Sequence, residues 1–258
     1  MNFQELTNGP FFILGPCVIE NQQLLRLIAE EVARLREKFQ VPVIFKASYD
    51  KANRTSASAY RGLGMTEGLQ LLAGIKSEFG LPLLTDIHES HQAAIAAEIV
   101  DVIQIPAFLC RQTDLLQAAA ETGKIINIKK AQFLSGQDMK YPVEKVRSTG
   151  NQQILLCERG TMFGYNNLVV DFRNIPDMKA LGCPVVMDCT HSVQRPGGGG
   201  GKTSGNREFV PAMALAAKGF GASGYFLEIH PDPDSSPSDG PNMLPLHELE
   251  GLMLKLLS

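Results

Sequence analysis

The chain has 258 residues and a formal net charge of −3, so it is long enough to bury a substantial core but lacks the broad basic surface of a nucleic-acid binder. Its first residues lack the basic start and long apolar core of a signal peptide, and no apolar run reaches the roughly 20 residues that cross a bilayer. We therefore expect a cytoplasmic globular protein with no nucleic-acid or membrane partner.

Short apolar segments rich in β-branched residues alternate with helical patterns along the whole chain. We predict eight strands, at residues 11–17, 41–48, 81–88, 102–107, 124–130, 153–159, 184–190 and 224–230. Between them, apolar residues recur at helical spacing, most clearly at residues 22–39 and 113–123. Nearly continuous apolar strands are typical of a parallel sheet that is covered on both faces.

Eight strands alternating with helices predict an α/β protein, a (β/α)8 TIM barrel that forms one domain over residues 1–258. A doubly wound open sheet also alternates, but no G-x-G-x-x-G follows the first predicted strand. Three connections, at residues 49–65, 192–207 and 231–245, are too long for simple turns. All three follow carboxyl ends of strands, where barrel enzymes carry their active sites.

Polar side chains stand at or just after the end of each predicted strand, and these ends form one ring in a closed barrel. The ring consists of Cys17, Lys46, Ser48, Asp86, His88, Gln104, Lys129, Lys130, Glu158, Arg159, Asp188, His191, Glu228 and His230. We expect these side chains to converge on a single polar pocket.

One part of the ring is cationic and predicts an anionic ligand, because Arg and Lys suit phosphate and carboxylate groups. It comprises Lys46, Lys129 and Arg159, joined by Lys51 and Arg54 from the loop after the second strand. Of the adjacent Lys129 and Lys130, we expect one to be a surface residue or an ion-pair partner.

Another part of the ring has the donor types of a metal site. Cys17, His191 and Glu228 follow the first, seventh and eighth strands, which become neighbours when the barrel closes, and Asp239 lies in the next loop. Thiolate, imidazole and carboxylate suit zinc, iron(II) or manganese. No two of these residues share a short motif, so Cys17 as a small buried hydrophobic residue stays the alternative.

The stretch PGGGGGKTSG at residues 196–205 is similar to a phosphate-binding P-loop but departs from it. The P-loop motif requires glycine where this chain has Pro196, and the stretch follows a long loop instead of a strand. Five consecutive glycines favour mobility. We interpret the stretch as a lid that closes on substrate.

Seven blocks of sequence carry a resemblance to a known family. They are FKASYDKANRTS, DVIQIPAFLCRQTDLL, INIKKAQF, CERGTMFGYNNLVVD, DCTHSVQ, FLEIHPDP and SDGPNMLPL. In this order, and over nearly the whole chain, they resemble the 3-deoxy-D-manno-octulosonate 8-phosphate synthases. That resemblance implies a (β/α)8 barrel, usually a homotetramer. It also implies condensation of phosphoenolpyruvate with D-arabinose 5-phosphate on the route to the lipopolysaccharide inner core.

The resemblance also implies roles for individual residues. Phosphoenolpyruvate binding is implied for Lys46, Ser48, Gln104, Lys129 and Arg159. Arabinose 5-phosphate binding is implied for Asn53, Arg54, Thr55 and, lent by a neighbouring subunit, Arg111. Many family members have serine in place of Thr55, which preserves the hydroxyl. Catalytic roles are implied for Lys51, which lies between the two substrates, and for His191 and Asp239.

The family has a metal-dependent and a metal-independent branch, and the latter carries asparagine at the position of Cys17. The resemblance therefore places this chain in the metal-dependent branch. It implies one divalent ion per subunit, zinc, iron(II) or manganese, held by Cys17, His191, Glu228 and Asp239.

Three alternative functions differ from this interpretation. The related 3-deoxy-D-arabino-heptulosonate 7-phosphate synthases use erythrose 4-phosphate and carry a K-P-R-T-S-like stretch, whereas residues 51–56 here read KANRTS. An inactive anion- or metal-binding barrel would need neither a lid nor a complete set of polar strand ends. A zinc-dependent aldolase acting on dihydroxyacetone phosphate would use several histidine ligands, and only His191 is well placed.

Overall fold

The computed structural model describes residues 1–53, 56, 58–198 and 204–258. Within these residues, eight parallel strands form a barrel: β1 (Phe11–Gly15), β2 (Val43–Lys46), β3 (Leu83–Asp86), β4 (Val102–Ile105), β5 (Ile125–Lys129), β6 (Ile154–Glu158), β9 (Val185–Asp188) and β12 (Gly224–His230). They pair in this order, and β12 also pairs with β1, which closes the barrel. The predicted (β/α)8 barrel is confirmed.

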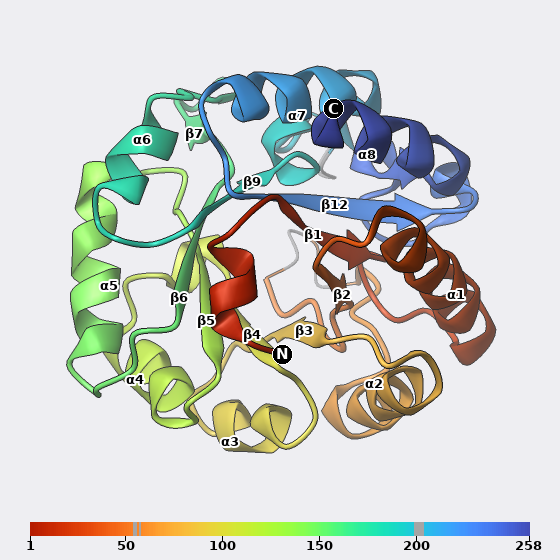
Figure 1. The fold of residues 1–258 in the computed structure, drawn as a ribbon, viewed down its shortest axis with the longest axis horizontal. Helices are drawn as coiled ribbons and strands as arrows, with labels where there is room; N and C mark the ends of the chain where they lie inside the picture. Colours follow the sequence, from red (N-terminus) through yellow and green to blue (C-terminus); the bar gives the residue numbers. More distant parts are fainter. Residues whose placement is uncertain (54–55, 57, 199–203) are drawn as a thin grey trace.

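Helices surround the barrel, as Figure 1 shows. They are α1 (Gln22–Phe39), α2 (Met65–Phe79), α3 (Gln92–Ala97), α4 (Thr113–Glu121), α5 (Lys140–Arg147), α6 (Asn174–Lys179), α7 (Val210–Gly219) and α8 (Leu249–Leu257). The prediction for residues 22–39 is confirmed at both ends. The side chain of Asn21 accepts a hydrogen bond from the backbone N–H of Leu24, and Gln40 ends the helix in a left-handed conformation.

The core has two layers because successive strand residues point to opposite faces of the sheet. In β1, Phe12 and Leu14 pack outward in the layer that includes the helices, whereas Phe11 and Ile13 point into the barrel. The short helix η1 (Phe3–Leu6) adds Leu6 to the interior layer, and it lies in front of the barrel centre in Figure 1. Apolar side chains therefore close this end of the barrel and leave the polar strand ends to the other.

The connections carry small β-elements that were not predicted. They are the pairs β7 (Thr161–Met162) with β8 (Leu168–Val169) and β10 (Gln194–Arg195) with β11 (Ser204–Gly205), and the strand β13 (Leu244–Pro245) beside β12. Two-residue strands are too short to show an alternating pattern. The β7–β8 hairpin makes the connection from β6 to α6 a fourth long one. The predicted lid at 196–205 lies partly outside the described residues.

No helix among the described residues has both the length and the apolar character needed to cross a bilayer.

Gly15, the last residue of β1, lies against the backbone of β2. A methyl group there would overlap the carbonyl oxygen of Lys46. We expect Gly15→Ala to lower the free energy of unfolding by about 3 kcal/mol or more, because a strand backbone cannot yield as a side chain can. Denaturant unfolding measures this loss.

A matched control is Gly74→Ala on α2, where a methyl group would contact nothing within 4 Å. Alanine in a helix interior is favoured, so this variant should gain about 0.5–1 kcal/mol. Equal unfolding midpoints for wild type and Gly15→Ala would contradict the prediction.

Candidate active site

A cavity of about 670 Å³ lies at the carboxyl ends of the barrel strands. Among the predicted site residues, its lining includes Lys46, Lys51, Asn53, Gln104, Lys129, Arg159, His191 and Asp239. Other members of the predicted ring are largely buried and are not part of the lining: Cys17, Ser48, His88, Lys130, Glu158, Asp188, Glu228 and His230. The expectation that the whole ring lines one pocket is therefore confirmed only in part, because about half of the ring lies behind the cavity lining.

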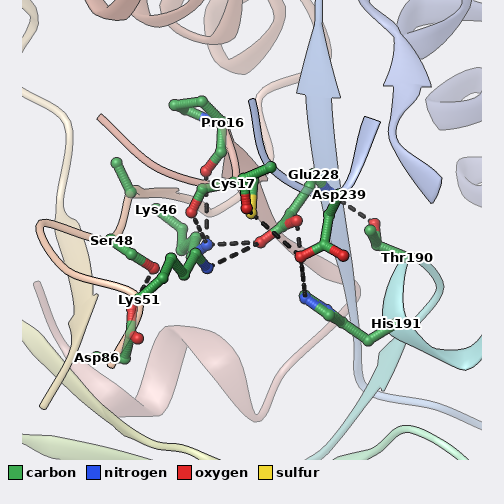
Figure 2. A network of polar contacts seen from close by, with 12 residues as sticks. Pro16, Cys17, Lys46, Ser48, Lys51, Asp86, Thr190, His191, Glu228 and Asp239 are labelled. Atoms are coloured by element: carbon green, nitrogen blue, oxygen red, sulfur yellow. Dashed lines mark hydrogen bonds and ion pairs between the residues drawn. The ribbon is translucent and has the colours of Figure 1, made fainter. Parts of the chain in front are cut away.

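Lys46 and Glu228 form a buried ion pair at the centre of the site (Figure 2). Lys46 Nζ lies 2.6 Å from Glu228 Oε1 and also donates to the carbonyl oxygen of Cys17 at 2.7 Å. Burial alone would raise the pKa of Glu228, but Lys46 and then His191 hold it well below its usual range. Lys51 Nζ, 3.9 Å from the same carboxylate oxygen, adds to this effect. The carboxylate is therefore ionised at neutral pH.

The four predicted metal ligands converge, as Figure 2 shows. Donor atoms of Cys17, Glu228 and Asp239 all lie within 4.8 Å of one another. His191 Nε2 lies 3.7 Å from Glu228 Oε2 and 4.0 Å from Asp239 Oδ2. Within the described residues, the buried Glu228 Oε2 has no hydrogen-bond partner. A thiol and two carboxylates within 4.8 Å of one another, with the imidazole of His191 beside the carboxylates and one unsatisfied oxygen, fit a divalent transition ion.

The thiol of Cys17 is protonated in this environment. Burial raises its pKa well above the usual range, and the Glu228 carboxylate raises it further. The sulfur lies 2.9 Å from Ser238 Oγ and 3.4 Å from Asp239 Oδ2. A metal ion bound here would displace the thiol proton, because the thiolate is the ligand form.

The cationic residues lie beside the metal-like cluster. Lys129 Nζ lies 2.6 Å from Asp188 Oδ2 and 4.0 Å from the ring centre of Phe226. Arg159 Nη2 donates to Gln194 Oε1 at 2.7 Å, whereas its buried Nη1 has no hydrogen-bond partner among the described residues. A buried guanidinium nitrogen with spare donors suits an anionic ligand.

Ser48 and Gln104, both expected to bind phosphoenolpyruvate, differ in their exposure to the cavity. The hydroxyl of Ser48 is buried and donates to Asp86 Oδ1, and Gln104 lines the cavity and accepts from Asn127 Nδ2 at 3.0 Å. Burial alone would raise the pKa of Asp86, but the hydrogen bond from His88 and the charge of Lys51 hold it well below its usual range. Asp86 is thus an ionised residue of the cavity wall to which sequence reasoning gave no role.

Each of the two adjacent lysines has an ion-pair partner, although only one was expected to, and Lys129 pairs with Asp188. Lys130 is the one that does not line the cavity. It is fully buried, lies 3.5 Å from Glu158 Oε1 and donates to the carbonyl oxygen of Leu134 at 3.1 Å. Lys129 keeps its side chain at the cavity. Adjacent strand residues point to opposite faces, which separates the two lysines.

The residues expected to bind arabinose 5-phosphate are described only in part. Asn53 is exposed and lines the cavity, whereas Arg54 and Thr55 lie outside the described residues. Arg111 is exposed and is not part of the cavity lining of its own chain; its carbonyl oxygen accepts from Lys145 Nζ at 2.6 Å.

Sequence reasoning missed Gln194, which joins the two parts of the site. Its amide donates to Asp239 Oδ1 at 3.0 Å while its oxygen accepts from Arg159. The available signal was its place three residues after His191 in the block DCTHSVQ. Glutamine is common on surfaces, so composition could not separate this residue from others.

Comparisons with known proteins cover the whole site. A sequence model described as the DAHP synthetase I family matches residues 7–256. A protein of Synechococcus sp. is 57% identical over 243 residues, which are 94% of this chain and 86% of that protein. Proteins of Cyanothece sp. and Syntrophobacter fumaroxidans are each 55% identical, over 96% and 97% of this chain and 92% and 87% of their own lengths. All three carry the name 2-dehydro-3-deoxyphosphooctonate aldolase.

Proposed function

This chain belongs to the DAHP synthetase I family and, within it, to the 2-dehydro-3-deoxyphosphooctonate aldolases, and we propose that its barrel mouth condenses phosphoenolpyruvate with D-arabinose 5-phosphate and water. The products are 3-deoxy-D-manno-octulosonate 8-phosphate and inorganic phosphate. The cavity with a cationic side beside a thiol, imidazole and carboxylate cluster is the observation that carries this proposal. The names of the relatives favour it over the erythrose 4-phosphate reaction.

Phosphoenolpyruvate would bind at the cationic side of the cavity. Lys46, Lys129 and Arg159 supply charge for its phosphate and carboxylate, and Gln104 adds an amide in the same wall. Ser48 would act after its hydroxyl exchanges Asp86 for the substrate. The cations would hold two anionic substrates together against their mutual repulsion and fix both reacting carbons in one orientation. This positioning would supply a large part of the catalysis.

Arabinose 5-phosphate would bind at the outer side of the cavity, near Asn53. Arg54 and Thr55 would bind the same substrate. Arg111 from a second copy would contact the sugar phosphate, which makes the expected homotetramer part of the site. All five cysteines are buried free thiols, which suits a protein that works in the reducing cytoplasm.

The bond-forming step would take place between these two regions. Carbon 3 of phosphoenolpyruvate attacks the aldehyde carbon of the sugar, and water adds to carbon 2. The resulting tetrahedral hemiketal phosphate loses phosphate by cleavage of its carbon–oxygen bond. Lys51, which lies 3.9 Å from Glu228, would stabilise negative charge that develops on the oxygens.

One divalent ion, zinc, iron(II) or manganese, would be held by Cys17, His191, Glu228 and Asp239. When bound, the ion supplies positive charge that can polarise the aldehyde or lower the pKa of water. His191 and Asp239 also line the cavity, so they would contact substrate or its water from the same side.

The choice of aldose tests the reaction. We expect phosphate release from phosphoenolpyruvate to be at least about 100-fold more efficient, in kcat/KM, with arabinose 5-phosphate than with erythrose 4-phosphate. A reaction without aldose is the control and should release no phosphate, which excludes simple hydrolysis. A preference for erythrose 4-phosphate would overturn the proposed substrate.

A further inference from the structure

Asp188 is a buried carboxylate at the end of β9 that contacts both parts of the site. Its side chain is 0% exposed. Oδ2 lies 2.6 Å from Lys129 Nζ, in the phosphoenolpyruvate part, and 2.9 Å from His191 Nδ1, in the metal part. The reaction proposed above gives this residue no role.

The position of Asp188 is fixed by its own turn. Oδ1 accepts hydrogen bonds from the backbone N–H groups of Thr190 at 3.2 Å and His191 at 2.8 Å. Both bonds come from the backbone of its own turn and restrict the direction of the carboxylate. A carboxylate fixed in this way can orient the side chains that contact it.

His191 has its two ring nitrogens in different surroundings. Nδ1 lies 3.1 and 2.9 Å from the two oxygens of Asp188 and 3.3 Å from Lys129 Nζ, whereas Nε2 faces Glu228 and Asp239. A proton on Nδ1 that is donated to Asp188 leaves the lone pair of Nε2 directed at the metal donor cluster. A carboxylate this close to Nδ1 favours the Nδ1–H tautomer, which is the form of the imidazole that can bind a metal ion through Nε2.

Lys129 lies between the same carboxylate and an aromatic ring. Its ammonium is 4.0 Å from the ring centre of Phe226, and the ring of His191 packs 5.7 Å from the same ring. The lysine therefore has a second favourable contact that keeps it near the cavity when Asp188 is not its closest partner. Lys129 and His191 share one carboxylate.

We propose that Asp188 is a positioning residue that couples phosphoenolpyruvate binding at Lys129 to metal binding at His191. The inference rests on the proposed function. An anionic substrate that attracts the ammonium of Lys129 leaves more of the Asp188 charge to polarise the Nδ1–H of His191. Nε2 of the imidazole then becomes a stronger ligand for the metal ion. By thermodynamic linkage, a bound ion strengthens phosphoenolpyruvate binding by the same factor.

Cobalt(II) binding to the metal-free protein tests the positioning without turnover. Asp188→Asn keeps an oxygen for the two backbone N–H groups but removes the charge. We expect the dissociation constant for cobalt(II), measured by calorimetry and by the thiolate-to-cobalt absorption band, to rise about 10- to 100-fold. An unchanged constant would overturn the proposal.

Glu158→Gln is a closely matched control on the neighbouring strand β6. Glu158 is also buried, lies 3.5 Å from a lysine, Lys130, and accepts from two backbone N–H groups, those of Arg159 and Gly160. It contacts no predicted metal ligand side chain in the described residues. This control should keep the cobalt(II) affinity of the wild type. Like Asp188→Asn, it should lose folding stability, because it also neutralises one partner of a buried ion pair.

The coupling is measured by repeating the cobalt(II) titration with saturating phosphoenolpyruvate. We expect the substrate to tighten cobalt(II) binding at least about fivefold in the wild type and in Glu158→Gln. In Asp188→Asn the effect should fall to the part caused by direct attraction between ion and substrate. The same tightening in Asp188→Asn and in the wild type would overturn the coupling.

A measurement on the wild type keeps the proposal testable if Asp188→Asn does not fold. In metal-free protein with ¹⁵N-labelled histidine, phosphoenolpyruvate should move the Nδ1–H proton resonance of His191 downfield, and an unmoved resonance would overturn the coupling. A wild type that binds no cobalt(II) would overturn both the ligand set and this inference. The aldose comparison would still test the proposed condensation separately.

Discussion

A Lys46→Met variant is expected to lose about 100- to 1000-fold in kcat, since it removes a preorganised donor from the site. It should also lose about 3–5 kcal/mol of folding free energy, because the buried Glu228 carboxylate loses its closest counter-charge and Lys51 lies 3.9 Å away. Lys46 Nζ and Glu228 Oε1 are 2.6 Å apart, and both side chains are buried. Phosphate release and denaturant unfolding of the metal-free protein measure the two losses.

Lys76→Met is the control for this prediction. Lys76 lies 2.9 Å from Asp101, but its side chain is 41% exposed, so the pair is screened by solvent. This variant should change the unfolding free energy by less than about 1 kcal/mol. If Lys46→Met unfolds no more readily than Lys76→Met, the Lys46–Glu228 pair does not stabilise the fold in the way the structure indicates.

Cys17→Asn is expected to weaken metal binding by more than about 100-fold. This exceeds the effect of losing a residue that only contacts a metal ligand. Some activity should remain, because Lys46 contacts the backbone carbonyl oxygen of Cys17 and not its side chain. Chelation of the wild type should lower its activity, and zinc, iron(II) or manganese added back should restore it. Calorimetry and phosphate release provide the measurements.

Cys110→Ala is the matched control, because Cys110 is also buried but packs in the outer core, away from the cavity. It should lose some stability through the space it leaves and keep the metal affinity of the wild type. Full activity of the metal-free wild type would remove the ion from the proposed reaction and leave the condensation itself intact.

The barrel strands could be predicted because their residues are apolar on both faces. All eight exist, but most are shorter than predicted. Cys17, Ser48 and His88 lie beyond the ends of β1, β2 and β3, where the chain leaves the sheet. Composition cannot locate the last residue of a strand here, because polar residues of the site occur both within the strands and just beyond their ends.

The convergence of the site could also be predicted, because barrel closure brings strand ends together whatever their separation in sequence. The partners of each side chain could not. The pairing of Lys46 with Glu228 and the position of Gln194 between Arg159 and Asp239 depend on side-chain directions within a crowded cavity. The roles proposed from family resemblance stay predictions that the experiments above test.

The closure of β1 on β12 has a consequence for how the protein is made. Cys17 and Asp239 lie 222 residues apart, and their contact exists only after the last barrel strand has joined the first. A growing chain therefore cannot assemble the proposed ligand set until nearly all of it has left the ribosome. An ion that binds only the closed barrel would then stabilise the folded state, and the concentration of the ion in the cell would set how much stability the newly made protein gains.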